Sequence, residues 1–174
     1  MRKVVEVLDR LEAEGYYERW SLAGATALMY YVPPVMTDDV DIAIALPTSG
    51  ILVSLAPLYE RLRKLGYNEV IGEHIRIEGA NVQFIMAAPG SVQESALRSK
   101  ARKVKLAGVS VRIFPLEHLL AIMVGLGRPK DRVRLAMVLS EHGDKVPWRK
   151  FNALVKKHGL EARLSRFKAE AGLE

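Results

Sequence analysis

An apolar segment that two acids interrupt constrains this chain more than any other feature. Residues 20–46 read WSLAGATALMYYVPPVMTDDVDIAIAL, and the apolar, β-branched end of this stretch contains Asp39 and Asp41. Its length and β-branching predict a buried or half-buried strand. Because side chains alternate faces along a strand, the two acids should point the same way, with Cα atoms roughly 6–7 Å apart.

Two carboxylates on one face of a strand repel each other. At an effective dielectric constant near 20 the repulsion is about 2–3 kcal/mol, and the sequence places no cation between Asp39 and Asp41. A divalent cation would remove this conflict, since Mg²⁺ or Mn²⁺ prefers carboxylate oxygens and keeps positions open for water and phosphates. The alternative is that Asp38, Asp39 and Asp41 cap a turn and begin an edge strand that is wetted on one side.

A second short motif lies about a dozen residues upstream of the two acids. Residues 22–28 read LAGATAL, which indicates a short apolar strand, a turn of small residues and the start of a helix. Backbone N–H groups and a hydroxyl in this layout can hold a phosphate. Gly24, Ala25 and Thr26 are therefore candidate nucleotide-binding residues.

Together the two motifs resemble the nucleotidyltransferase superfamily with the DNA polymerase beta type of catalytic fold. The family pattern is Gly-Ser or Gly-Gly-Thr at a helix start, then a short spacer and Asp-x-Asp on the next strand. Here Gly24-Ala25-Thr26 and Asp39-Val40-Asp41 match it. The abortive-infection toxin type is the most similar branch, and residues 107–120 and 127–132 extend the resemblance to about residues 20–140.

The resemblance implies a fold, an activity and partners. The fold is α+β, with a mixed β-sheet and helices followed by a C-terminal helical bundle. The activity is transfer of a nucleoside monophosphate from a nucleoside triphosphate to a hydroxyl of RNA or protein, with Mg²⁺ or Mn²⁺ on Asp39 and Asp41. Arg128 and Lys130 are candidate phosphate contacts, and a partner protein from a two-gene toxin–antitoxin system is expected.

One position of the family's carboxylate triad differs in this chain. The third acid of the family lies on a later strand, and the matching segment, residues 81–86, has the neutral amide Gln83 there. Gln83 is therefore a candidate catalytic-site position without a charge, and Glu73 or Glu78 could supply the missing acid. The alternative function is a catalytically degenerate nucleotidyltransferase fold that binds nucleic acid or a protein.

Composition narrows the class of protein. The chain has 174 residues and no cysteine, so disulfides and thiolate metal sites are excluded. No secretory leader and no apolar run of roughly 20 residues is visible, so we expect a soluble, cytoplasmic protein without a membrane partner. We expect a nucleotidyltransferase-like domain over residues 1–113 and a helical region over residues 114–174, with a soft boundary.

The two halves of the chain carry opposite charge. Residues 1–97 contain 8 Lys and Arg against 13 Asp and Glu, a net charge of −5. Residues 98–174 contain 18 against 7, a net charge of +11. A basic half beside an acidic one suits a polyanionic substrate, although a basic surface also serves solubility alone.

Hydrophobic periodicity and turn residues predict the remaining elements. We expect an antiparallel meander of short strands joined to the strand that holds Asp39, and a small helical bundle that packs against the sheet. Ser49 is the expected cap of a helix that ends near Leu65, and His142 and His158 are read as structural residues at helix ends. The expected helices are 3–14, 25–31, 49–65, 92–98, 115–125, 130–142, 148–158 and 160–171, and the expected strands are 20–23, 39–46, 68–72, 74–78, 81–86 and the two arms of a hairpin over 104–113.

Overall fold

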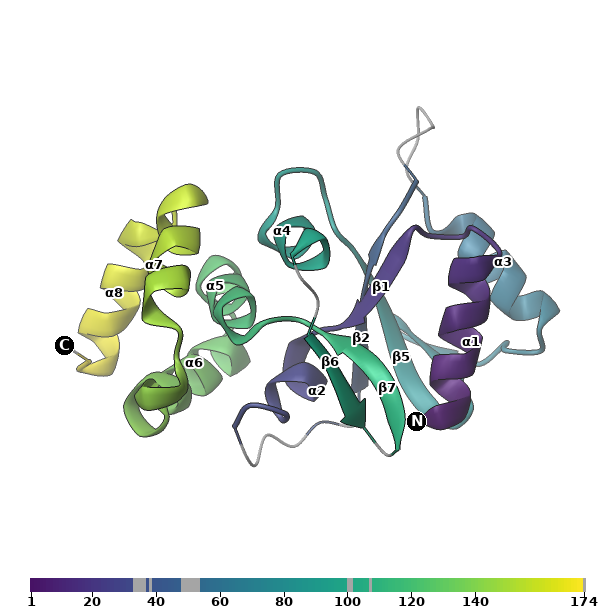
Figure 1. The fold of residues 1–174 in the computed structure, drawn as a ribbon, viewed down its shortest axis with the longest axis horizontal. Helices are drawn as coiled ribbons and strands as arrows, with labels where there is room; N and C mark the ends of the chain where they lie inside the picture. Colours follow the sequence, from purple (N-terminus) through teal and green to yellow (C-terminus); the bar gives the residue numbers. More distant parts are fainter. Residues whose placement is uncertain (33–36, 38, 48–53, 100–101, 107, 174) are drawn as a thin grey trace.

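The structure, a computed structural model, describes residues 1–32, 37, 39–47, 54–99, 102–106 and 108–173. In this part a mixed sheet of seven strands has the order β3-β4-β5-β2-β1-β7-β6 and carries helices on both faces (Figure 1). The strands are β1 (Arg19–Leu22), β2 (Asp39–Ala45), β3 (Val70–Ile71), β4 (His74–Ile77), β5 (Ala80–Met86), β6 (Arg102–Leu106) and β7 (Val109–Ile113).

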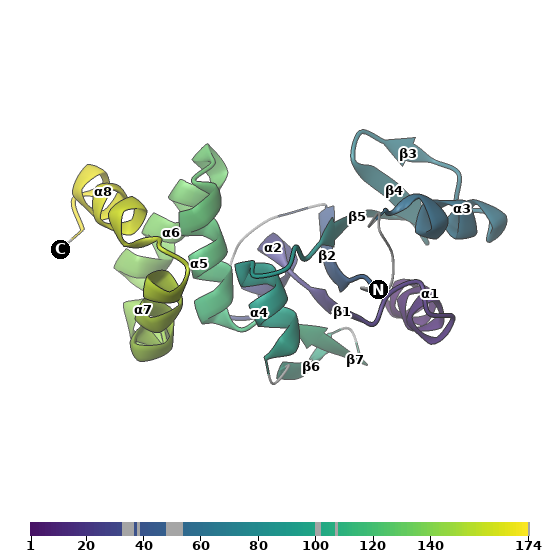
Figure 2. The same ribbon diagram turned by 90° about the horizontal axis from the view of Figure 1, so that it is seen from above.

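The helices cover both faces of the sheet and then continue beyond it. Helices α1 and α3 lie on one face, α2 and α4 lie on the other, and α5 to α8 extend away from the sheet toward the C-terminus (Figure 1, Figure 2). This is the α+β arrangement that the sequence predicts. The helices are α1 (Arg2–Ala13), α2 (Gly24–Leu28), α3 (Ala56–Lys64), α4 (Val92–Arg98), α5 (Leu116–Leu126), α6 (Pro129–Glu141), α7 (Trp148–Lys157) and α8 (Glu161–Ala171), with a 3₁₀ turn at Gly143–Lys145.

Strand β2 lies in the interior of the sheet. It pairs antiparallel with β1 and parallel with β5, and Asp41 stands opposite Gln83 in that register. Ile42 and Ile44 are fully buried, and each such side chain stabilises the fold by about 1.5–3 kcal/mol relative to exposure. The predicted strand is confirmed, whereas the edge-strand alternative is wrong because β2 has a partner on each side; Asp38 lies outside the described residues.

The predicted meander is confirmed, and it reaches β2 through a parallel pair. Strands β3, β4 and β5 pair antiparallel in sequence order. Strand β3 has only two residues, both exposed, so it is shorter than predicted. Gly72 and Gly79 have positive φ at the two hairpin turns, a conformation that glycine adopts without steric cost.

Two helices are shorter than their sequence patterns predict. The described helix α3 begins at Ala56, where Pro57 in the first turn needs no N–H partner. Ser54 accepts a hydrogen bond from the Ala56 N–H at 3.1 Å, and Ser49 lies outside the described residues. Helix α2 ends at Leu28, because the chain tightens into a turn in which the Tyr31 N–H donates to the Leu28 carbonyl.

Helix α5 is the centre of the C-terminal helices. Its apolar side chains are buried almost all round, and it contacts α6, α7 and α8 as well as α2 and α4. The bundle therefore meets the rest of the fold mainly through α2 and α4, rather than packing directly on the sheet as expected. The boundary at residue 113 stays a prediction.

Helix ends follow the predicted stops in this region. His142 and His158 occupy the C-cap positions of α6 and α7, and Gly127 ends α5 in the left-handed conformation. Across the described ranges, no helix combines the length and apolar character needed to cross a membrane.

Candidate functional site

A cleft of about 230 Å³ brings most of the predicted site residues together. Strands β2 and β5 form one side, and helices α5 and α6 form the other. Of the eight predicted site residues, those that line it are Gly24, Ala25, Asp41, Gln83, Arg128 and Lys130. The prediction therefore gathered residues that are about one hundred positions apart in the sequence.

Gly24 is fixed by its contact with Asp41. Its φ is +53°, in the left-handed region, at the junction of β1 and α2. A Cβ atom at this position would lie 1.7 Å from Oδ2 of Asp41, far inside van der Waals contact. Only glycine allows the backbone to approach the carboxylate so closely.

The fold brings basic side chains close to the two acids, although the sequence did not place these side chains beside them. Nε2 of His74 lies 3.6 Å from Oδ1 of Asp39. Burial raises the pKa of Asp41 above its ordinary value, while the nearby Lys130 and Arg128 act to lower that pKa. The negative charge on β2 is thus partly balanced within the chain, and it faces a cleft whose opposite wall is basic.

Two of the predicted residues do not line the cleft. Thr26 is 6% exposed, and its hydroxyl donates a hydrogen bond to the main-chain carbonyl of Asp39 at 2.8 Å. Thr26 therefore ties α2 to the start of β2, instead of presenting its hydroxyl to the cleft. The side chain of Asp39 is 44% exposed and lies beside His74 at the rim of the site.

Two acids, Glu73 and Glu78, are candidates for the third acid that the family has at the position of Gln83. The Gln83 amide donates from Nε2 to Oε2 of Glu73 at 2.6 Å. Glu78 is engaged elsewhere, since it accepts a hydrogen bond from the Tyr67 hydroxyl at 2.8 Å and lies 3.6 Å from the Lys3 ammonium. Of the two candidate acids, Glu73 is the one that reaches Gln83.

Arg128 is held rigidly at the start of α6. Its guanidinium makes two hydrogen bonds to Asp131, at 2.6 and 3.2 Å, and Asp131 is 3% exposed. This hydrogen bonding raises the pKa of Arg128. A bidentate contact of this kind fixes the orientation of the guanidinium, so Arg128 is a cation with a set position beside Lys130 in the first turn of α6.

The donor set fits a hard cation that shares its ligands with a substrate. Among the described residues, no three His, Cys, Asp or Glu side chains gather as they would for a fully protein-held metal. Mg²⁺ commonly binds one or two carboxylates and completes its shell with water and substrate phosphates. Asp39 and Asp41 meet that requirement, with oxygen donors only.

Sequence reasoning missed several residues of this region. His74 and the buried Asp131 are not among the predicted site residues. The apolar wall comes from one side of α5, through Leu119, Ile122 and Met123. No local spacing in the sequence signals these contacts, because each of them depends on how the β3–β4 hairpin and α5 pack.

Comparisons with known proteins support the fold. No protein-family model matches the sequence, and no curated protein matches it significantly. An antigenic nucleotidyltransferase-like protein from Paracoccidioides brasiliensis matches with a TM-score of 0.51 at 15% identity, over 96% of this chain and 86% of that chain. The solution structure of the antibiotic-resistance factor ANT(2'')-Ia matches with a TM-score of 0.52 at 12% identity, over 97% and 95%.

These two matches extend over nearly the whole chain, so the helical C-terminal region belongs to the match together with the sheet. At such low identity they establish the fold alone. Similarity to the abortive-infection toxin branch stays a prediction. The chain has a nucleotidyltransferase-like fold.

Proposed function

We propose that this protein is a metal-dependent nucleotidyltransferase that moves a nucleoside monophosphate from a nucleoside triphosphate to a hydroxyl acceptor and releases diphosphate. The observation that carries the proposal is the cleft in which Asp41, pressed against Gly24, faces Lys130 and Arg128. An acid for a metal and cations for phosphates thus meet in one cavity.

The residues of the cleft have separate roles in this proposal. Asp39 and Asp41 would hold Mg²⁺ or Mn²⁺, and the metal would supply positive charge that neutralises the phosphates. Lys130 and Arg128 attract the triphosphate, and the main chain of Gly24 and Ala25 lines the space beside it. Thr26 has a structural role, because its hydroxyl is bonded to the Asp39 carbonyl.

Glu73 supplies the missing third acid. Its carboxylate, in the turn between β3 and β4, accepts the Gln83 amide hydrogen bond at 2.6 Å, and Gln83 stands opposite Asp41 in the pairing of β2 with β5. From there it accepts the proton of the attacking hydroxyl, a step that is typically worth 10²–10⁴-fold in rate. Gln83 is then a positioning residue that holds Glu73.

The acceptor is a hydroxyl of RNA or protein, and the net charge of +11 on residues 98–174 supports a polyanionic one. The resemblance to the toxin branch adds a partner protein from a two-gene system, and the cysteine-free composition suits a cytoplasmic location. These assignments rest on sequence alone.

The test is transfer of label from each nucleoside triphosphate, with Mg²⁺ or Mn²⁺, to total RNA or protein. Asp41→Asn should abolish transfer, and Glu73→Gln should slow it by roughly 10²–10⁴-fold. Glu78→Gln is the matched control, because Glu78 is bonded to Tyr67 and away from Gln83. If Glu73→Gln and Glu78→Gln behave alike, Glu73 is not the third acid.

The second candidate is a degenerate module that binds nucleotide or nucleic acid without transfer. The neutral amide at position 83, opposite Asp41, favours it. Saturable nucleotide binding that depends on Lys130, with no label transferred under any metal condition, would establish this alternative in place of the enzyme.

A further inference from the structure

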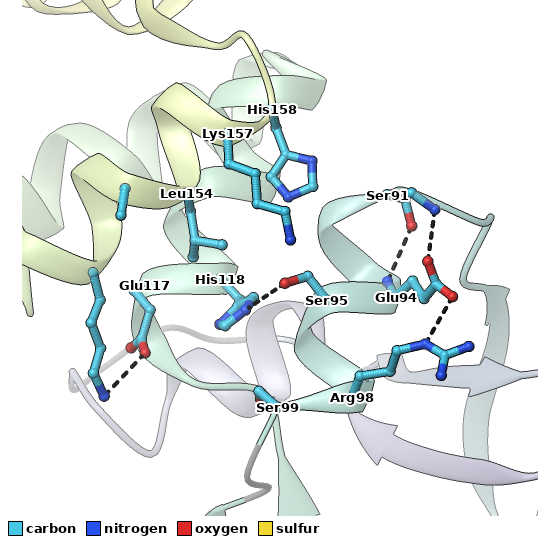
Figure 3. A pocket seen from close by; sticks show the side chains of 13 residues that line it. Ser91, Glu94, Ser95, Arg98, Ser99, Glu117, His118, Leu154, Lys157 and His158 are labelled. Atoms are coloured by element: carbon cyan, nitrogen blue, oxygen red, sulfur yellow. Dashed lines mark hydrogen bonds and ion pairs between the residues drawn. The ribbon is translucent and has the colours of Figure 1, made fainter.

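A second and larger cleft lies between α4, α5 and α7, with a volume of about 610 Å³ (Figure 3). We call it the α4–α7 cleft. Helix α4 separates it from the site at Asp41, since Gln93 lines that site while Ser91, Ser95 and Arg98 line this cleft. Its volume is within the roughly 300–1,000 Å³ that small-molecule sites occupy.

Two imidazoles in this cleft have buried nitrogens without a hydrogen-bond partner among the described residues. They are Nδ1 of His118, a residue that is 6% exposed, and Nε2 of His158. A buried polar atom left unpaired costs about 1–3 kcal/mol, and native structures leave few of them. Two such atoms in one cleft indicate that a hydrogen-bonding partner belongs there.

The contact of His118 with Ser95 is compatible with either tautomer of the imidazole, and one of the two makes Nδ1 a hydrogen-bond donor. Nε2 of His118 lies 3.4 Å from the Ser95 hydroxyl oxygen (Figure 3). When the hydroxyl donates to Nε2, a neutral imidazole carries its proton on Nδ1. Nδ1 is then a donor, so the missing partner is a hydrogen-bond acceptor.

The charges around the cleft favour an anion. Arg98 pairs with Glu94 at 2.9 Å, and Lys150 lies 3.7 Å from Glu117. Lys157 forms no ion pair within the described ranges, and its side chain extends into the cleft below His158 (Figure 3). One cation is therefore left over when the other charged groups of the lining are paired.

A positively charged ligand fits poorly here. Burial lowers the pKa of His118, and His158, Lys150 and Lys157 lower it further, while Glu117 acts in the opposite direction. The cleft thus already opposes an added positive charge on the imidazole. A bound anion would reduce the repulsion between these positive charges, whereas a metal ion would increase it.

We propose that the α4–α7 cleft binds a small molecule through a phosphate group, which accepts hydrogen bonds from His118 and His158 and pairs with Lys157. A terminal phosphate offers three strong acceptor oxygens, one for each of these donors. The shared chemistry is the phosphate oxyanion, and its source is either free phosphate or the phosphate of a nucleotide. This site is independent of the function proposed for the cleft at Asp41.

Calorimetric titration with inorganic phosphate and with adenosine 5′-monophosphate, without divalent metal, tests the site. Lys157→Gln should weaken binding by roughly tenfold or more, as expected for loss of a charge-assisted contact. Lys156→Gln is the matched control, since Lys156 is the neighbouring exposed lysine on α7 and does not line the cleft.

Imidazole ¹⁵N spectra of the natural chain give a readout that does not depend on any variant. Phosphate or the nucleotide should shift the ring signals of His118 and His158 and leave those of His142 in place. Binding of the nucleotide alone would identify the source as a phosphate ester, and equal binding of both would identify free phosphate. The proposal is overturned if neither compound binds saturably, if Lys157→Gln and Lys156→Gln bind alike, or if the ring signals do not move.

Discussion

The cleft at Asp41 and the α4–α7 cleft differ in how their polar groups are satisfied. In the first, Asp39 lies beside His74, Gln83 donates to Glu73, and Arg128 is bonded to Asp131. In the second, His118 and His158 each keep a buried nitrogen without a partner in the described chain. The first cleft is organised before any ligand arrives, whereas the second is complete only when a hydrogen-bond acceptor is present.

The two clefts also differ in whether backbone or side chains determine their shape. The first cleft depends on backbone that approaches a carboxylate closely, because Gly24 touches Asp41. The second depends on side chains from three helices that surround an open space. Backbone changes should therefore damage the first cleft most, and solution conditions should affect the second.

Gly24→Ala should produce the largest loss. The substitution puts a Cβ atom 1.7 Å from Asp41 Oδ2 and forces alanine into a left-handed conformation. Left-handed backbone costs roughly 1–2 kcal/mol and overpacking about 1–3 more, so we expect a destabilisation of about 2–5 kcal/mol by urea unfolding. Displacement of Asp41 should also remove any thermal stabilisation by Mg²⁺.

Gly15→Ala is the matched control for that change. Gly15 has a φ of +80°, and no heavy atom lies within 4 Å of the place that an alanine Cβ would take. The variant therefore carries the backbone strain without the clash, and should cost only about 1–2 kcal/mol. Equal losses in the two variants would mean that Asp41 moves freely and that the first cleft is not held by this contact.

Arg128→Ala and Lys130→Gln should have different effects in the first cleft. The first should lower stability, and the second should weaken nucleotide binding. Loss of Arg128 leaves the buried Asp131 without its guanidinium partner, which should cost about 1–3 kcal/mol of stability. Lys130→Gln should leave stability nearly unchanged but weaken nucleotide binding. Urea unfolding and nucleotide titration of both variants check this division, and a stability loss in Lys130→Gln would contradict it.

The sequence predicted the first cleft well because its central residues follow local rules. Strand alternation placed Asp39 and Asp41 on one face, and the next long apolar strand carried Gln83 to a position opposite Asp41. The strands of the hairpin that carries Glu73 and His74 were predicted, but its angle to this edge was not, because that angle depends on tertiary packing. The close contact of Gly24 with Asp41 could not be predicted either, because only the structure reveals it.

The second cleft left no local signal. His118 lies in a helix of mostly apolar residues. His158 has the sequence pattern of a helix end, and it is the C-cap of α7. Ser95 is on α4, more than twenty residues before His118. Such a site is visible only when three helices are placed together, because no spacing in the sequence relates them.

The smallest effect we predict is a pH dependence of stability that comes from His118. Burial lowers its pKa from the ordinary value of 6.5 in the folded protein. Below about pH 6.5 the unfolded chain therefore binds a proton that the folded one does not, and the free energy of unfolding falls as the pH falls. One proton gives a slope of at most about 1.4 kcal/mol per pH unit, and above about pH 6.5 this contribution vanishes.

Urea unfolding between about pH 7.5 and about pH 5.5 measures this slope. His118→Asn should flatten it, because asparagine takes up no proton, and phosphate should flatten it in the natural chain, because a bound anion favours the charged imidazole. The groups that surround His118, namely Glu94 and Arg98 on α4, Glu117 on α5, and Lys150, Lys157 and His158 on α7 and its C-cap, are unchanged in that variant. If the natural chain and His118→Asn lose stability equally on acidification, the dependence arises elsewhere, and the α4–α7 cleft does not differ from the first cleft in its response to pH.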